Sequence, residues 1–245
     1  MITERYRFAN LGVEITSTYP QIHMLCKDYV SSCPPEITVA VGPEDIVYEQ
    51  EKAIQHAKQE GLSEPQYPKT YLEALTVHRK MAESFPAFER MLIHGSALAL
   101  DGQGYLFTAA SGVGKSTHSR LWRELFGHRV VMINDDKPLL HITPTVTRVY
   151  GSPWAGKHFL SANISAPLKG VCFLERGQSN EITEITADEA YTLLLKQCYR
   201  PKDRDAMLRT LELLDTLSHT VGMYRLRCNM DIQAARVACE RLTRR

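Results

Sequence analysis

Nine residues from 109 to 117, Ala-Ala-Ser-Gly-Val-Gly-Lys-Ser-Thr, constrain this chain more than any other segment. An apolar stretch, residues 105–107, precedes them, and residues 118–126 have helical character. A glycine-rich turn between a strand and a helix gathers backbone N–H groups and the positive end of the helix around one point, which attracts anions. The pattern therefore predicts a phosphate-binding loop. The alternative, a turn that only caps a helix, leaves Lys115 and Ser116 without a role.

Each position of this loop has an expected role. Gly112 and Gly114 let the backbone turn so that its N–H groups face phosphate oxygens. Lys115 is expected to hold the terminal phosphates of a nucleotide, and the Ser116 hydroxyl to ligate its Mg²⁺. Ala109 stands where the general pattern has its first glycine. The predicted nucleotide-binding residues are Ser111, Gly112, Val113, Gly114, Lys115, Ser116 and Thr117.

Composition excludes several other classes of protein. The 245 residues can form one large domain, alone or with a small companion. A net charge of +1 without a basic cluster argues against nucleic acid as a partner. No apolar run is long enough to span a membrane, and the first residues lack an apolar signal core, so we expect a cytoplasmic protein. The six cysteines have no zinc-like spacing and are expected to be reduced.

Periodicity divides the chain into two parts. Residues 1–85 predict a small α+β module, with strands at 5–17 and 36–41, a short amphipathic segment at 22–29 and helices at 43–58 and 70–84. Residues 86–245 predict an α/β domain that carries the loop. Its further strands are expected at 129–134, 138–143, 146–150, 169–175 and 223–227, and its helices at 187–199, 203–218 and 231–242.

The strand that enters the loop is expected to belong to a hairpin. Residues 91–94 and 97–100 predict one long strand, and residues 101–104 predict a tight turn. The return strand, 105–108, then leads directly into the loop. A Rossmann-like βαβ order would instead reach the loop through a crossover helix. The pattern therefore favours a mixed, largely antiparallel sheet.

Two adjacent carboxylates, Asp135 and Asp136, follow the apolar strand that ends at Asn134. In proteins with a phosphate-binding loop, a metal-binding aspartate occupies such a position. One carboxylate can hold Mg²⁺ while the other accepts a proton from an attacking hydroxyl. The alternative is a turn stabilised by Asn and Asp side chains, with no chemistry.

Two other segments carry candidate residues. His94 lies on the strand predicted to pair with the one that enters the loop, so it could reach the phosphates; the alternative is a histidine satisfied in the core. In the turn-rich stretch 151–158, Trp154 could form an apolar wall for the acceptor, and Lys157 could neutralise charge on the transferred group. The alternative is a surface loop, in which case Arg200 and Lys202 become the acceptor-binding candidates.

The order of His94-Gly95, residues 111–116 and Asp135-Asp136 resembles the catalytic domain of the HPr kinase/phosphorylase family, over about residues 89–175. That family shares its fold with phosphoenolpyruvate carboxykinases and has a small residue ahead of its Gly-x-Gly-Lys. The resemblance implies a carboxykinase-like P-loop kinase domain with a mixed, largely antiparallel sheet. It further implies that Lys115 and Ser116 bind ATP and Mg²⁺, that Asp136 is the carboxylate on the metal side, that Asp135 is the general base and that His94 lies beside the phosphates.

The departures from the family narrow the predicted function. The glycine-rich signature of HPr kinases, E-[IV]-R-G-[LI]-G, is absent, and residues 151–158 occupy roughly its place, so an acceptor other than HPr is expected. About 85 residues are too few to replace the large substrate domain of a carboxykinase.

The sequence therefore predicts an ATP- and Mg²⁺-dependent kinase that phosphorylates a hydroxyl, above all of Ser, in a peptide, protein or small molecule. The alternatives are a nucleotide-binding regulator without catalysis and a reversible kinase/phosphorylase. A homo-oligomer is compatible with each of these three functions.

Overall fold

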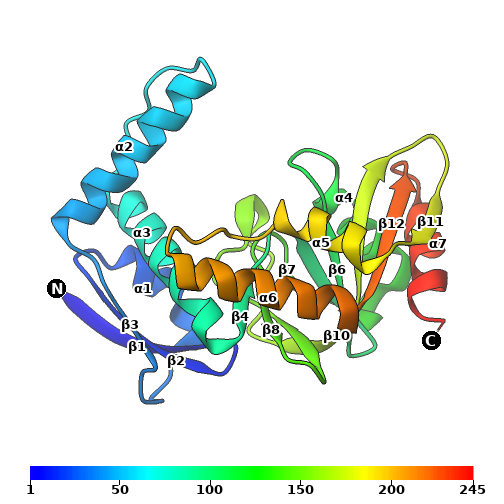
Figure 1. The fold of residues 1–245 in the computed structure, drawn as a ribbon, viewed down its shortest axis with the longest axis horizontal. Coiled ribbons are helices and arrows are strands. Elements are labelled where there is room, and N and C mark those ends of the chain that lie inside the picture. Colours follow the sequence, from blue (N-terminus) through cyan, green and yellow to red (C-terminus); the bar gives the residue numbers. More distant parts are fainter. Residues whose placement is uncertain (245) are drawn as a thin grey trace. The chain divides into compact units, whose positions relative to one another are not determined.

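The computed structural model describes residues 1–244, which divide into two compact units, one of residues 1–84 and the other from residue 85 onward (Figure 1). The first unit contains a three-stranded sheet in which β2 pairs antiparallel with β1 and parallel with β3. Its strands are β1 (Ile2–Phe8), β2 (Leu11–Ser17) and β3 (Ile37–Ala40), and its helices are α1 (Gln21–Leu25), the 3-10 turn η1 (Lys27–Tyr29), α2 (Pro43–Gln59) and α3 (Lys69–Ser84).

The single strand predicted for residues 5–17 is wrong, because the chain reverses there. Ala9 and Asn10 adopt positive φ angles of 47° and 67°. Two such residues form the tight turn whose twist matches that of a two-stranded hairpin, and Asn tolerates this conformation better than most residues. The loose alternation on either side of the turn therefore belongs to two paired strands, β1 and β2.

The second unit combines a mixed sheet with helices. Its strands are β4 (Arg90–Leu92), β5 (Ser96–Leu100), β6 (Gln103–Thr108), β7 (Val130–Asn134), β8 (Leu139–Ile142), β9 (Thr147–Tyr150), β10 (Ser165–Arg176), β11 (Glu181–Glu184) and β12 (Gly222–Cys228). Its helices are α4 (Lys115–Phe126), α5 (Ala187–Leu195), α6 (Arg204–Thr220) and α7 (Ile232–Leu242), with the 3-10 turns η2 (Phe85–Phe88), η3 (Gly127–Arg129) and η4 (Gly156–His158). The sequence did not predict β11, which is only four residues long and has Glu at both ends.

The strand order in this sheet is β4-β8-β9-β10-β6-β5-β7, and β12 pairs with both β10 and β11. The long strand β10 pairs parallel with β6 and β12, but antiparallel with β9 at its beginning. The pair β5–β6 is the antiparallel hairpin expected ahead of the loop. The sheet is therefore mixed, with β6 lying between β5 and β10 where it delivers the chain to the loop.

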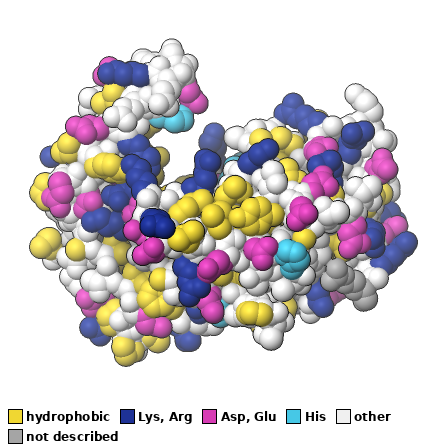
Figure 2. Space-filling model, in the orientation of Figure 1, with side chains coloured by type: hydrophobic (Ala, Val, Ile, Leu, Met, Phe, Trp, Pro, Cys, Tyr) yellow, Lys and Arg dark blue, Asp and Glu magenta, His cyan; other side chains and the backbone are white. Residues whose placement is uncertain are grey.

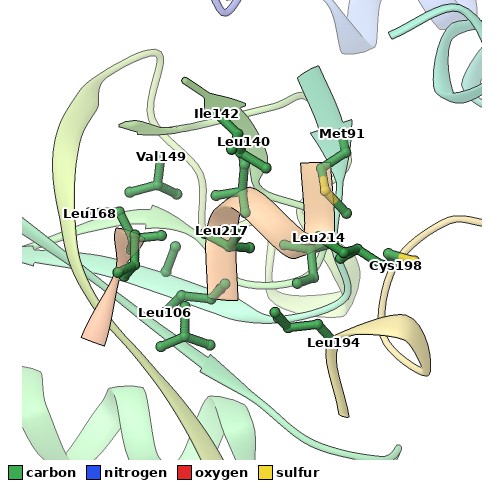
Figure 3. Packing of buried hydrophobic residues seen from close by; sticks show 14 of the residues in the cluster. Met91, Leu106, Leu140, Ile142, Val149, Leu168, Leu194, Cys198, Leu214 and Leu217 are labelled. Carbon is green, nitrogen blue, oxygen red and sulfur yellow. The ribbon is translucent and has the colours of Figure 1, made fainter. Parts of the chain in front are cut away.

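Helices cover both faces of this sheet. On one face, Leu213, Leu214 and Leu217 of α6 pack against strand residues such as Leu106 and Leu140 (Figure 3). On the other face, α4 and α7 cover alternate residues of β5, β6, β10 and β12. A strand buried on both faces carries an almost continuous apolar run, which explains why β5 and β6 consist mostly of apolar residues.

The long strand predicted across residues 91–100 is also wrong, because it breaks at His94-Gly95. β4 pairs with β8, whereas β5 pairs with β6 and β7. A Cβ at Gly95 would lie 2.7 Å from Leu106 Cδ1 and 3.0 Å from the Phe107 carbonyl oxygen. A side chain at this position would displace Leu106 and crowd the Phe107 carbonyl, so glycine favours the close passage of the chain along β6 as it changes neighbours. The break leaves His94 in a bend between two strands.

Charged side chains of both signs lie on the surface, as the net charge of +1 leads one to expect. On the face shown in Figure 2, cationic and anionic side chains lie interspersed. None of the helices within residues 1–244 combines the length and the apolar character needed to cross a bilayer. The six cysteines of the described chain are free thiols.

The helix that follows the loop is anchored by Trp122, which is fully buried. Its ring packs against Tyr105, Phe107 and Phe126, with ring centroids 5.3–5.5 Å apart. Replacing a buried Trp with Ala removes this packing and leaves a cavity, so we expect Trp122→Ala to lower the free energy of unfolding by about 3–5 kcal/mol. Urea denaturation measures the change.

The matched control is Leu208→Ala, which removes a half-exposed side chain from α6. It should change the free energy of unfolding by about 0.5 kcal/mol or less. Equal effects of the two substitutions would mean that Trp122 does not anchor α4.

Candidate functional site

The loop residues lie between the end of β6 and the start of α4. Gly112 and Gly114 have φ angles of 76° and 125°, which L side chains rarely adopt, so both glycines are required for the turn. Arg176 at the end of β10 donates from Nη2 to the Gly112 carbonyl at 2.6 Å. The loop is thus tied to the sheet by a residue distant in the sequence.

Lys115, the first residue of α4, extends back over this loop. Its Nζ donates to the carbonyls of Ala109 at 2.9 Å and Ala110 at 3.4 Å. Burial lowers the pKa of Lys115, and the carboxylate of Asp136 opposes that effect. An ammonium group so placed, beside N–H groups at a helix start, forms a site of positive potential.

Asn134 organises the turn that carries both carboxylates. Its Oδ1 accepts from the backbone N–H groups of Asp136 at 2.8 Å and Lys137 at 2.7 Å. Its Nδ2 lies 3.0 Å from the Ser152 carbonyl and 3.3 Å from that of Trp154. The turn stabilised by an Asn side chain, offered as the alternative to chemistry, is therefore present, and it fixes the two carboxylates rather than excluding their use.

A chain of hydroxyl groups holds Asp135. The buried hydroxyl of Ser96, on β5, donates to Asp135 Oδ1 at 2.6 Å and lies 2.5 Å from the hydroxyl of Ser119. Because the single proton of Ser96 goes to Asp135, the Ser119 hydroxyl is the donor toward Ser96, and the Lys115 carbonyl, 3.1 Å from Ser119 Oγ, is its alternative acceptor. The strand that ends in the carboxylates and the helix that begins at the loop are thus joined through two serines.

Asp136 is more exposed than Asp135 and lies among cationic and titratable groups. Its Oδ1 is 3.1 Å from Lys137 Nζ and 3.5 Å from His94 Nε2. The pKa of His94 is lowered to about 4, first by burial and then by the charges of Lys137 and Lys115, against the effect of Asp136. The imidazole is therefore neutral at pH 7 and can accept or donate a hydrogen bond.

One cavity of about 440 Å³, which we call the loop cavity, brings most of the predicted residues together. It is lined by His94, Ser111, Gly112, Gly114, Lys115, Ser116, Thr117, Asp135, Asp136, Gly156, Lys157 and His158. Of the other candidates, Val113 lines a neighbouring cavity. Trp154, Arg200 and Lys202 line neither cavity, so the expected apolar wall at Trp154 is not part of this site.

Two further cavities adjoin the loop cavity. The apolar cavity, of about 680 Å³, shares Gly112, Gly114 and Thr117 with it. The arginine cavity, of about 440 Å³, shares Ser116, Thr117, Asp135 and His158 with it and adds Arg120, Arg123 and Leu160. Thr117 lines all three cavities.

The oxygen atoms in the loop cavity suit Mg²⁺ bound together with phosphates. Mg²⁺ prefers hydroxyl and carboxylate oxygens, and it is usually held by one or two carboxylates plus the phosphates of a substrate. Ser116, Asp135 and Asp136 supply such oxygens. Within residues 1–244 no three or more His, Cys, Asp or Glu side chains form a group able to hold a metal by themselves. The donor set therefore fits a Mg-nucleotide better than a closed metal centre.

Sequence reasoning missed the residues that hold this site together. Ser96 begins the apolar strand β5, and a polar residue at that place was a detectable signal, whereas Ser119 lies among polar residues of α4 and gave none. Arg176 carried no signal, because its partner Gly112 lies far away in the sequence. As arranged, the cavity can bind phosphates, neutralise their charge and accept a proton at a carboxylate.

Comparison with solved structures gives a weak similarity to the Hpr(Ser) kinase/phosphatase from Coxiella burnetii. The match has 16% sequence identity and a TM-score of 0.29, and it covers 49% of this chain and 87% of that chain. No curated protein matches the sequence. The family model of SynChlorMet cassette protein ScmC matches residues 72–233, which is more than half of the chain. This protein therefore belongs to the ScmC family.

Proposed function

We propose that this protein transfers the terminal phosphate of Mg-ATP to a hydroxyl group, with Ser of a peptide or protein, or the hydroxyl of a small molecule, as acceptor. The observation that carries the proposal is the loop cavity itself, in which Lys115 and Ser116 face two carboxylates. Phosphoryl transfer requires positioning and charge neutralisation rather than covalent chemistry, and these residues provide both. The fold that goes with this proposal is a carboxykinase-like P-loop kinase domain.

Binding of the nucleotide follows from the charges in the cavity. The loop N–H groups and Lys115 bind the phosphates, and Lys157 at the rim adds a second positive charge. Ser116 and Asp136 would hold Mg²⁺, which neutralises charge on the phosphates when bound. The neutral imidazole of His94 can hydrogen-bond the transferred group without adding charge.

Asp135 is suited to be the general base because it lines both the loop cavity and the arginine cavity. An acceptor that enters through the arginine cavity meets the terminal phosphate beside this carboxylate. The acceptor oxygen then forms a bond to the γ-phosphorus, its proton passes to Asp135, and the bond to the β-phosphate oxygen breaks to release ADP. The hydrogen bond from Ser96 fixes the carboxylate for this role.

A kinase that uses ATP and carries reduced cysteines suits the cytoplasm. ATP is abundant in the cytoplasm, and free thiols persist in that reducing compartment. We therefore propose a cytoplasmic protein whose partners are its nucleotide and its hydroxyl acceptor, with no role for nucleic acid or a membrane.

Removal of the Lys115 ammonium tests nucleotide binding. Because this group makes charge-assisted bonds in a cavity partly shielded from water, Lys115→Ala should raise the Kd for Mg-ATP by about 100-fold or more. Isothermal titration calorimetry measures the change. The matched control is Lys169→Ala, which removes an exposed lysine outside the cavity and should leave the Kd as in the wild type. Equal Kd values for all three proteins would refute the assignment of the loop.

Separate substitutions of the two carboxylates test their roles. Asp135→Asn should bind Mg-ATP normally but transfer phosphate about 100-fold more slowly, since a proton acceptor is lost. Asp136→Asn should instead raise the Mg²⁺ concentration needed for half-maximal activity. Transfer is measured as label moved from γ-labelled ATP to a library of Ser-containing peptides and to small alcohols.

The pattern of results separates the competing functions. Exchanged phenotypes of the two variants would reverse their roles. Tight Mg-ATP binding without transfer by the wild-type protein would favour a nucleotide-binding regulator. Transfer of the label from a phosphorylated acceptor onto added inorganic phosphate, which frees the hydroxyl and forms labelled pyrophosphate, would identify a reversible kinase/phosphorylase.

A further inference from the structure

The apolar cavity begins where the loop cavity ends. The two share Gly112, Gly114 and Thr117, so a ligand bound along the loop can extend from one into the other. The apolar cavity has a volume of about 680 Å³, within the range of roughly 300–1,000 Å³ typical of small-molecule sites. Its apolar walls are formed by Val113, Leu121, Leu174, Cys228 and Met230, and polar groups come from Thr117, His118, Arg176, Gln178 and Asn229.

The charges in the two cavities determine which end of a ligand would lie in each. Both carboxylates and Lys115 line the loop cavity, whereas no Asp or Glu lines the apolar cavity. The reacting end of a phosphate chain must lie beside the carboxylates and the lysine. Its other end therefore leaves past Thr117 toward the apolar walls, while the arginine cavity, which includes Asp135, remains on the side of the acceptor.

His118 provides an independent indication of a ligand in the apolar cavity. This residue lines the cavity and is only 2% exposed. Trp122 Nε1 donates to His118 Nε2 at 3.0 Å, so Nε2 carries no proton and the neutral ring carries it on Nδ1. Nδ1 is buried and has no hydrogen-bond partner within the described chain. A buried N–H donor without a partner is rare in proteins, and an acceptor atom on a bound ligand would satisfy it.

We infer that the apolar cavity holds the nucleoside of the phosphate donor, with its base against Leu174 and Met230 and an acceptor atom within reach of His118 Nδ1. A flat heterocycle with several acceptor atoms suits a pocket that combines apolar walls with a few polar side chains. The donor of the proposed kinase is accordingly a nucleoside triphosphate, and not inorganic polyphosphate. This inference rests on the proposed function.

Paired titrations of Mg-ATP and Mg-tripolyphosphate separate the contribution of the nucleoside from that of the phosphates. For the wild-type protein we expect ATP to bind about 100-fold more tightly, because burial of a base contributes affinity that tripolyphosphate lacks. Met230→Ala should raise the Kd for ATP about 5-fold and leave that for tripolyphosphate unchanged. The matched control is Met24→Ala, which removes a similarly exposed methionine from the first unit and should change neither value.

A blocking substitution gives the stronger test. Cys228→Trp should fill the apolar cavity, so that the variant binds ATP no better than tripolyphosphate. Retained binding of tripolyphosphate proves that this variant is folded. Met230→Ala, at a residue that is 79% exposed, provides the same readout without a change in the core.

The outcomes distinguish failure of this inference from failure of the proposed function. Equal binding of ATP and tripolyphosphate by the wild-type protein, or unchanged ATP binding by both cavity variants, overturns the nucleoside site while the phosphate site stands. No binding of either ligand overturns the proposed function and the nucleoside site together.

Discussion

The side chain of Asn134 is the connection on which the geometry of the candidate site depends. Its oxygen accepts two backbone N–H groups of the turn that carries the carboxylates, and its two N–H groups face oxygens of Ser152, Trp154 and Ser161. An aspartate of the same shape would present only acceptors to those oxygens and could not make these bonds. One fully buried amide thus fixes both the carboxylates and the segment that leads to Lys157.

Electrostatic balance explains how groups of opposite charge share so small a cavity. Lys115 and Lys137 lie near Asp136, and burial disfavours the charged form of the nearby His94, which stays neutral. The loop cavity combines the carboxylates of Asp135 and Asp136 with the ammonium groups of Lys115 and Lys157. Phosphates and a divalent cation together would satisfy both kinds of charge, whereas either alone would leave one kind unbalanced.

The sequence predicted the parts of this protein that rest on local patterns. The loop, the helix after it, the hairpin β5–β6 and the strand ending in the carboxylates all follow from spacing within a few residues. The breaks at Ala9-Asn10 and His94-Gly95 were missed, because alternation continues across a turn and the close approach of Gly95 to β6 is a tertiary contact. The bonds of Ser96 and Arg176 could not be predicted either, since their partners lie far away in the sequence.

Amide hydrogen exchange with and without Mg-ATP tests most directly the claim that three separate segments form one nucleotide site. We predict slower exchange at residues 111–117, 134–137 and 156–158 when Mg-ATP is present, because a ligand that contacts all three restricts their local opening. Exchange in the sheet of the first unit, β1–β3, should stay the same. Protection confined to residues 111–117, with 134–137 unchanged, would contradict the claim.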